Sequence, residues 1–144
     1  MEANTKPDAM KPQPLMLRTK YSAAMKVQAL YALMCIVWNA VVIFQMHAGF
    51  QPIGPTGSTV VITGAVILVA LLAYSLHSGW ELAYVLLAAV VSLLALSAVF
   101  SSMTNSSDAW PSEFWQVAGL LINVIGALSF LVVITLLIRG RRAL

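Results

Sequence analysis

Charge is what this sequence lacks over most of its length. Only 9% of its 144 residues are charged, whereas soluble domains carry about 25%. Between residues 27 and 107 the only Asp, Glu, Lys or Arg is Glu81, and no Lys or Arg occurs from 27 to 138. An ordinary soluble fold is excluded, because its surface needs many charged side chains. A nucleic-acid interface is excluded as well, because it needs a basic face.

The residues that carry common enzyme chemistry are also missing. The single cysteine, Cys35, permits neither an intrachain disulfide nor a cysteine-based metal site. No glycine-rich phosphate loop, no H-E-x-x-H and no G-x-S-x-G occurs. Met46 and His47 offer copper ligands, but adjacent residues do not share a helix face. We therefore predict no catalytic residues, no cofactor and no metal site.

Long apolar runs are what the sequence does contain. A helix needs about 20 apolar residues to cross the hydrocarbon of a bilayer, and it bonds its own backbone polar groups. Four runs come close to that length, and none contains a charge. We predict an all-α integral membrane protein, a four-transmembrane-helix bundle. Its helices are expected at about 27–46, 59–76, 82–100 and 117–138.

The segments outside these runs complete the predicted organisation. Residues 1–14 contain three prolines and no apolar periodicity, which predicts a disordered cytoplasmic tail before a transmembrane domain at 15–144. Residues 15–26 mix basic and apolar side chains, so they lie along the membrane surface or begin the first helix. Glycine and proline make a loop of 47–58, and small polar residues followed by aromatic residues make a connection of 101–116.

The basic residues predict the orientation. All eight lie before residue 27 or after residue 138. Basic residues favour the cytoplasmic side, so both termini are expected in the cytoplasm, which requires an even number of crossings. The basic tail and the short connections suit a bacterial inner (plasma) membrane.

Glu81 raises the question of a working carboxylate within the membrane. Ser78 and Glu81 form the pattern S-x-x-E before an apolar run, which is typical of a capping box, and a negative charge in the first turn also suits the helix dipole. This places Glu81 at the cytoplasmic rim. A proton carrier is expected deeper, so a functional role, together with His77, is the alternative.

Two amides, Asn39 and Asn123, lie well inside the predicted helices at similar depths. Buried amides seek partners across helices, so we expect the two either to meet or to face one polar seam, with Gln116 on the same face as Asn123. Small and polar residues also recur on one face of three helices: Gln28, Ala32, Cys35 and Asn39; Ala88, Ser92 and Ala95; Gln116, Gly119, Asn123 and Gly126. These stripes indicate helix packing or, alternatively, the wall of a polar path or of a binding cavity.

The function predicted from these features is structural. A chain without a catalytic set, but with stripes suited to helix–helix contact, is expected to be an accessory, assembly or scaffold subunit. Its expected partners are the lipid bilayer and either further copies of itself or a larger membrane complex, with no nucleic acid. The alternative is a small oligomeric transporter or channel lined by Asn39 and Asn123. A membrane enzyme using titratable groups at the rims is a third possibility.

Overall fold

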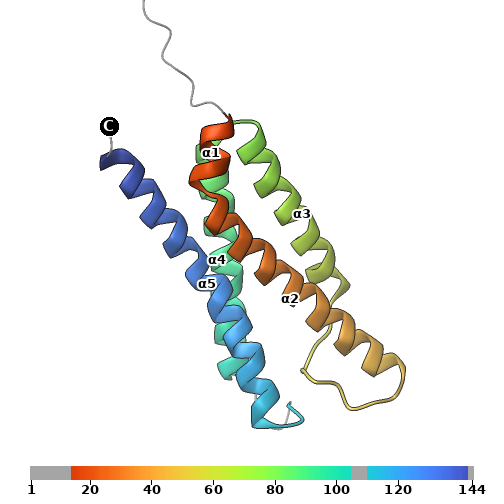
Figure 1. Cartoon of the computed structure of the whole chain (residues 1–144). Coiled ribbons are helices and arrows are strands. Elements are labelled where there is room, and N and C mark those ends of the chain that lie inside the picture. The colour runs from red at the N-terminus through yellow and green to blue at the C-terminus, as the bar shows by residue number, and fades with distance from the viewer. Residues whose placement is uncertain (1–13, 105–109, 143–144) are drawn as a thin grey trace, which may run out of the picture.

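Helices are the only regular elements in residues 14–104 and 110–142, the part of the chain that the computed structural model describes (Figure 1). They are α1 (Pro14–Lys20), α2 (Ser22–His47), α3 (Thr59–His77), α4 (Glu81–Thr104) and α5 (Glu113–Arg142). Helices α2 to α5 are each long and apolar enough to cross a membrane. The prediction of an all-helical chain with four such helices is therefore confirmed. The predicted disordered tail lies outside the described residues, apart from Pro14.

Helical structure extends beyond the apolar runs, because backbone hydrogen bonding continues into polar flanks. Residues 15–26 are helical on both sides of Tyr21, as expected if they begin the first helix. A short helix, α1, ends at Lys20, and the first turns of α2 begin at Ser22. Tyr21 joins the two helices with φ −101° and ψ 10°, and its N–H still donates to the Leu17 carbonyl at 3.0 Å.

The tight turn between α3 and α4 is built around a glycine. Gly79 has φ +76°, a left-handed conformation that costs glycine little. The Trp80 N–H donates to the Ser75 carbonyl at 2.8 Å, which closes the end of α3 as a Schellman motif. The end of α2 is built in the same way around Gly49, with φ +74°. The local sequence therefore sets where both helices end.

The four long helices pack in a ring, each against the next in the chain, and α2 also packs against α5. Toward one end α2 and α3 diverge from α4 and α5 (Figure 1). We call this the loop end; it carries residues 48–58 and Trp110. The opposite end, called the terminal end, carries α1, the turn at 78–80 and the last turns of α5 (Figure 1).

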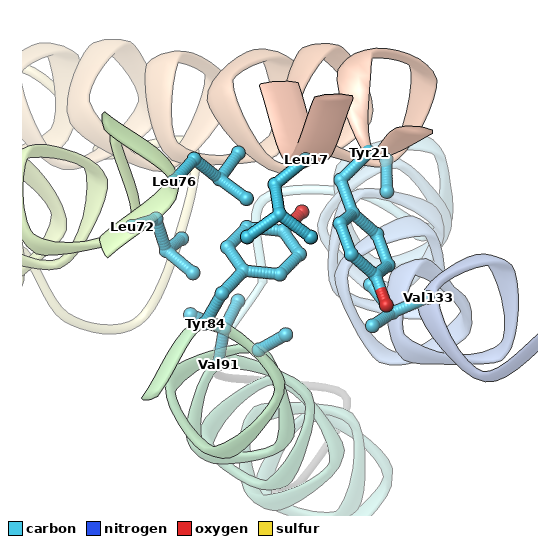
Figure 2. Close-up of a cluster of buried hydrophobic side chains, with 9 residues drawn as sticks. Leu17, Tyr21, Leu72, Leu76, Tyr84, Val91 and Val133 are labelled. Carbon is cyan, nitrogen blue, oxygen red and sulfur yellow. The ribbon is translucent and has the colours of Figure 1, made fainter. Parts of the chain in front are cut away.

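The apolar core lies at the terminal end. Figure 2 shows the Tyr84 ring of α4 among side chains from α1, α3 and α5. The Tyr21 ring lies 4.9 Å from it between centroids. The buried residues of this cluster are Leu17, Tyr21, Ala24, Leu72, Leu76, Tyr84, Ala88, Val91 and Val133. The side chains of this cluster join α1, α3, α4 and α5 at the terminal end.

Candidate functional site

The loop end of the bundle contains a cavity of about 490 Å³. It arises because α3 and α4 leave the tight turn together and then diverge (Figure 1). On the opposite side a cluster of tryptophan side chains still joins α2 to α5 beside the cavity. Trp38 of α2 packs against Trp110 and Trp115, with ring centroids 6.4 and 5.9 Å away. The mouth of the cavity therefore lies between α3 and α4.

The exposure of the lining residues agrees with this position of the mouth. Val60 of α3 is 78% exposed and Leu94 of α4 is 55% exposed, and both line the cavity. At the inner end the wall is formed by Leu72 and Val91, which also belong to the core. The cavity thus ends at the packed core and opens at the side of the bundle.

The stripe predicted on the first long helix lines this cavity. Gln28, Ala32, Cys35 and Asn39 are all part of its wall. The stripe on α4 has a different place: Ala88, Ser92 and Ala95 are buried, and the Ser92 hydroxyl donates to the Ala127 carbonyl of α5 at 2.6 Å. The stripe on α2 therefore lines a cavity, whereas the stripe on α4 packs two helices together.

Asn39 and Asn123 line the same cavity from α2 and α5. Asn39 Oδ1 accepts from the Ser58 N–H at 2.9 Å, and its Nδ2 donates to the Cys35 carbonyl at 2.8 Å. Ser58 is the N-cap of α3, so Asn39 attaches the start of α3 to α2. The two amides do not bond each other within the described part of the chain.

The Asn123 amide joins α5 to α2. Its Oδ1 accepts from the Tyr31 hydroxyl at 3.2 Å, and its Nδ2 donates to the Gly119 carbonyl at 2.9 Å. One face of α5 therefore continues the polar wall that α2 begins. Gln116, predicted on the same seam, donates from Nε2 to the Ser102 carbonyl of α4 at 3.4 Å.

Glu81 lies at the terminal end, far from the cavity, as the first residue of α4. Its Oε1 accepts from the Lys20 ammonium at 2.7 Å and from the Tyr21 hydroxyl at 2.5 Å. The carboxylate thus attaches the α1–α2 junction to the start of α4, a role that the sequence analysis did not predict.

Ser78 does not occupy the N-cap position of α4 that a capping box requires. It is the C-cap of α3, and its N–H donates to the Tyr74 carbonyl at 2.8 Å. Gly79 follows in a left-handed conformation, which cannot be the first residue of a helix, so α4 begins at Glu81. The pattern S-x-x-E does not show whether the serine is a C-cap or an N-cap, because a serine suits both the end of one helix and the start of the next.

The inner end of the cavity carries a buried polar pair. The Tyr84 hydroxyl donates to Gln28 Oε1 at 2.8 Å, and Gln28 is only 1% exposed. Gln28 Nε2 and, at the other end of the cavity, Trp110 Nε1 are buried and have no hydrogen-bond partner in residues 14–104 and 110–142. Gln28 was expected on a stripe that packs helices or lines a path or cavity, and Trp110 was expected only as an aromatic residue of the membrane interface. Their common location was not visible in the sequence, since 82 positions separate them along the chain (110 − 28).

The histidines lie at the ends of α2 and α3. His47 Nδ1 is 2.8 Å from the Ile43 carbonyl, one turn back in its own helix. In residues 14–104 and 110–142 no three His, Cys, Asp or Glu side chains lie together as metal ligands would. No protein-family model, curated protein or solved structure matches the chain.

Proposed function

We propose that this protein binds a lipophilic small molecule in the cavity at the loop end of its bundle. The observation that carries the proposal is a cavity of about 490 Å³ in a small bundle whose apolar core lies toward the opposite end. Ligand sites have volumes of about 300–1,000 Å³, with mostly apolar walls and a few polar groups. This cavity has that size, and its wall combines aliphatic side chains with two asparagines and one glutamine.

The proposed setting is a bilayer crossed four times, with both termini in the cytoplasm. Two observations support this setting. All eight basic residues lie at the two ends of the sequence, and four helices are long and apolar. In this orientation the loop end faces outward, and the mouth between α3 and α4 opens toward the outer half of the bilayer. A ligand could then enter directly from the lipid. The proposed location is a bacterial inner membrane.

A binding role is better supported than the accessory, assembly or scaffold role. That hypothesis rested on stripes of small residues available to partners. The α4 stripe is buried against α5 of the same chain, so it does not argue for a partner. The oligomeric channel rested on free amides along a polar path, and both Asn39 and Asn123 are engaged within the chain. Both roles stay open as proposals with less support.

Tryptophan quenching by bromododecane, a neutral apolar probe, tests the proposal. The chain has four tryptophans, and replacing Trp80 and Trp115 by phenylalanine leaves Trp38 and Trp110, which both line the cavity. The protein would be studied in phosphatidylcholine nanodiscs. Binding in the cavity should produce quenching that saturates, whereas probe dissolved in the bilayer quenches in proportion to its concentration.

A cavity-filling variant provides the decisive comparison. Gly64 of α3 lines the cavity, and a Cβ added there meets no atom within 4 Å. Gly64→Leu should therefore fold and remove most of the saturable quenching. Ala70→Leu, on an exposed face of the same helix, adds the same side chain outside the cavity and should leave the quenching unchanged. Equal saturable quenching in both variants, or none in the parent protein, would refute the proposal.

A further inference from the structure

Two buried hydrogen-bond donors belong to residues of the cavity wall. They are Gln28 Nε2, in a residue 1% exposed, and Trp110 Nε1, in a residue 8% exposed. Neither has a partner among the described residues. Buried donors without an acceptor are costly and uncommon in folded proteins. Because both residues line the cavity, a molecule that fills it is a suitable partner for both.

The chemistry of the two groups defines what that molecule offers. An indole N–H donates and cannot accept. The Gln28 carbonyl already accepts from the Tyr84 hydroxyl at 2.8 Å, which leaves the amide NH₂ group. The ligand must therefore present hydrogen-bond acceptors at these positions, and further donors on the ligand would find no equivalent partner there.

The wall also defines the charge of the ligand. None of the described lining residues is Asp, Glu, Lys, Arg or His. The amides of Asn39 and Asn123 are already bonded within the chain. A charge placed in an apolar site without a counter-charge carries a large desolvation cost. An uncharged ligand is the one that this wall accommodates.

The separation of the donors indicates the shape of the ligand. Gln28 lies ten residues before Trp38 on α2, which corresponds to about 15 Å along the helix. The Trp110 ring packs against Trp38, so the two donors lie toward opposite ends of the cavity. The wall between them is largely aliphatic, with Ala32 and Leu68 among its residues. This arrangement suits an elongated apolar molecule.

We infer that the ligand is an uncharged, elongated lipophile that carries carbonyl- or ether-type acceptor oxygens, and that Gln28 and Trp110 are the groups that recognise those oxygens. The inference rests on the proposed function and specifies its ligand class. Both nitrogens are covered in the structure, so each side chain must turn slightly to present its N–H. The terminal torsions of amide and aromatic side chains are broad, which makes such a turn easy.

A matched series of brominated probes tests this inference in the Trp80→Phe, Trp115→Phe protein in nanodiscs. Bromododecane has no acceptor oxygen, methyl ω-bromododecanoate adds a neutral ester, and ω-bromododecanoate adds an anion to a chain of the same length. After correction for partition into the bilayer, the ester should bind about fivefold to tenfold more tightly than bromododecane, as expected for one added hydrogen bond. The anion should bind more weakly than the ester.

Two sets of variants assign the preference to the two donors. Gln28→Leu combined with Tyr84→Phe removes the donor together with its hydrogen-bonded partner, which avoids leaving the tyrosine hydroxyl unpaired. Trp110→Phe removes the indole N–H and keeps an aromatic ring. Removing both donors together should reduce the preference for the ester over bromododecane to about onefold. Tyr84→Phe alone keeps both donors and should keep the preference.

Each failure has a distinct meaning. If bromododecane binds saturably but the ester is not preferred, this inference is overturned and the proposed function stays intact. Ordered water would then be the partner of the two donors. A preference that survives removal of both donors would overturn their role in recognition. Tighter binding of the anion would overturn the assignment of an uncharged ligand. Absence of saturable binding by every probe would refute the proposed function itself.

Discussion

Alanine substitutions at Gly126 and Gly64 should have opposite effects on stability, although both glycines lie inside apolar helices. At Gly126 of α5 an added Cβ would lie 2.5 Å from Tyr31 Cζ and 2.6 Å from Tyr31 Cε2. The tyrosine ring would have to move, and its hydroxyl would lose the hydrogen bond to Asn123. At Gly64 of α3 an added Cβ meets no atom within 4 Å.

The expected magnitudes follow from three contributions. Both variants gain about 1 kcal/mol of helix propensity. Gly126→Ala also incurs about 1–3 kcal/mol of overpacking and loses a hydrogen bond worth about 0.6 kcal/mol within a helical membrane bundle. The propensity gain is common to both variants and cancels in the comparison. Gly126→Ala should therefore be less stable than Gly64→Ala by about 2–4 kcal/mol.

Reversible unfolding in mixed micelles, followed by far-ultraviolet circular dichroism as dodecyl sulfate is added, measures this difference. A double-mutant cycle with Tyr31→Leu identifies the cause, because removing the ring should abolish most of the cost of Gly126→Ala. The reasoning would be refuted if the two alanine variants were equally stable, or if the cost persisted when Tyr31 was leucine.

Two further variants test the terminal end by thermal unfolding in a non-ionic detergent. Glu81→Gln removes the charge that holds Lys20 and Tyr21, and it should destabilise the protein by about 1 kcal/mol, because the side chains of the ion pair are still 24% and 30% exposed to solvent. The loss should shrink at high sodium chloride, and a loss independent of salt would contradict an ionic origin. Gly79→Ala places a side chain at φ +76° and should cost about 1–2 kcal/mol. A neutral effect there would show that the turn adopts another conformation.

The long helices could be predicted because the signal for each one lies in neighbouring residues. A run of about 20 uncharged apolar residues is a property of neighbouring positions, so the number of long helices could be counted from the sequence. Their ends were less predictable. The fourth apolar run was expected from 117, and Pro111, which suits the first turn of a helix, allowed a start near 111. Helix α5 begins between the two, at Glu113. For residues 15–26 the sequence did not show the break at Tyr21, which separates α1 from the first turns of α2.

The candidate site was predictable only in part. The sequence placed Asn39 and Asn123 at similar depths and expected them to face one seam, and the structure places both at one cavity. It could not assign their bonds, because the partners, Ser58 and Tyr31, come from other segments. Trp110 was interpreted as an aromatic residue of a membrane interface, and its contact with the cavity depends on how α5 packs against α2.

The sequence alone determined the helical class, the four long apolar helices and the concentration of basic residues at both ends. Each of these features depends on composition within a short window of the chain. The tertiary structure decided which stripe packs a helix and which lines a cavity. The stripes on α2 and α4 contain similar small and polar residues, so their composition cannot separate the two roles. The separation arises because α2 and α3 diverge from α4 and α5 at the loop end, and that divergence depends on contacts between helices far apart in the chain.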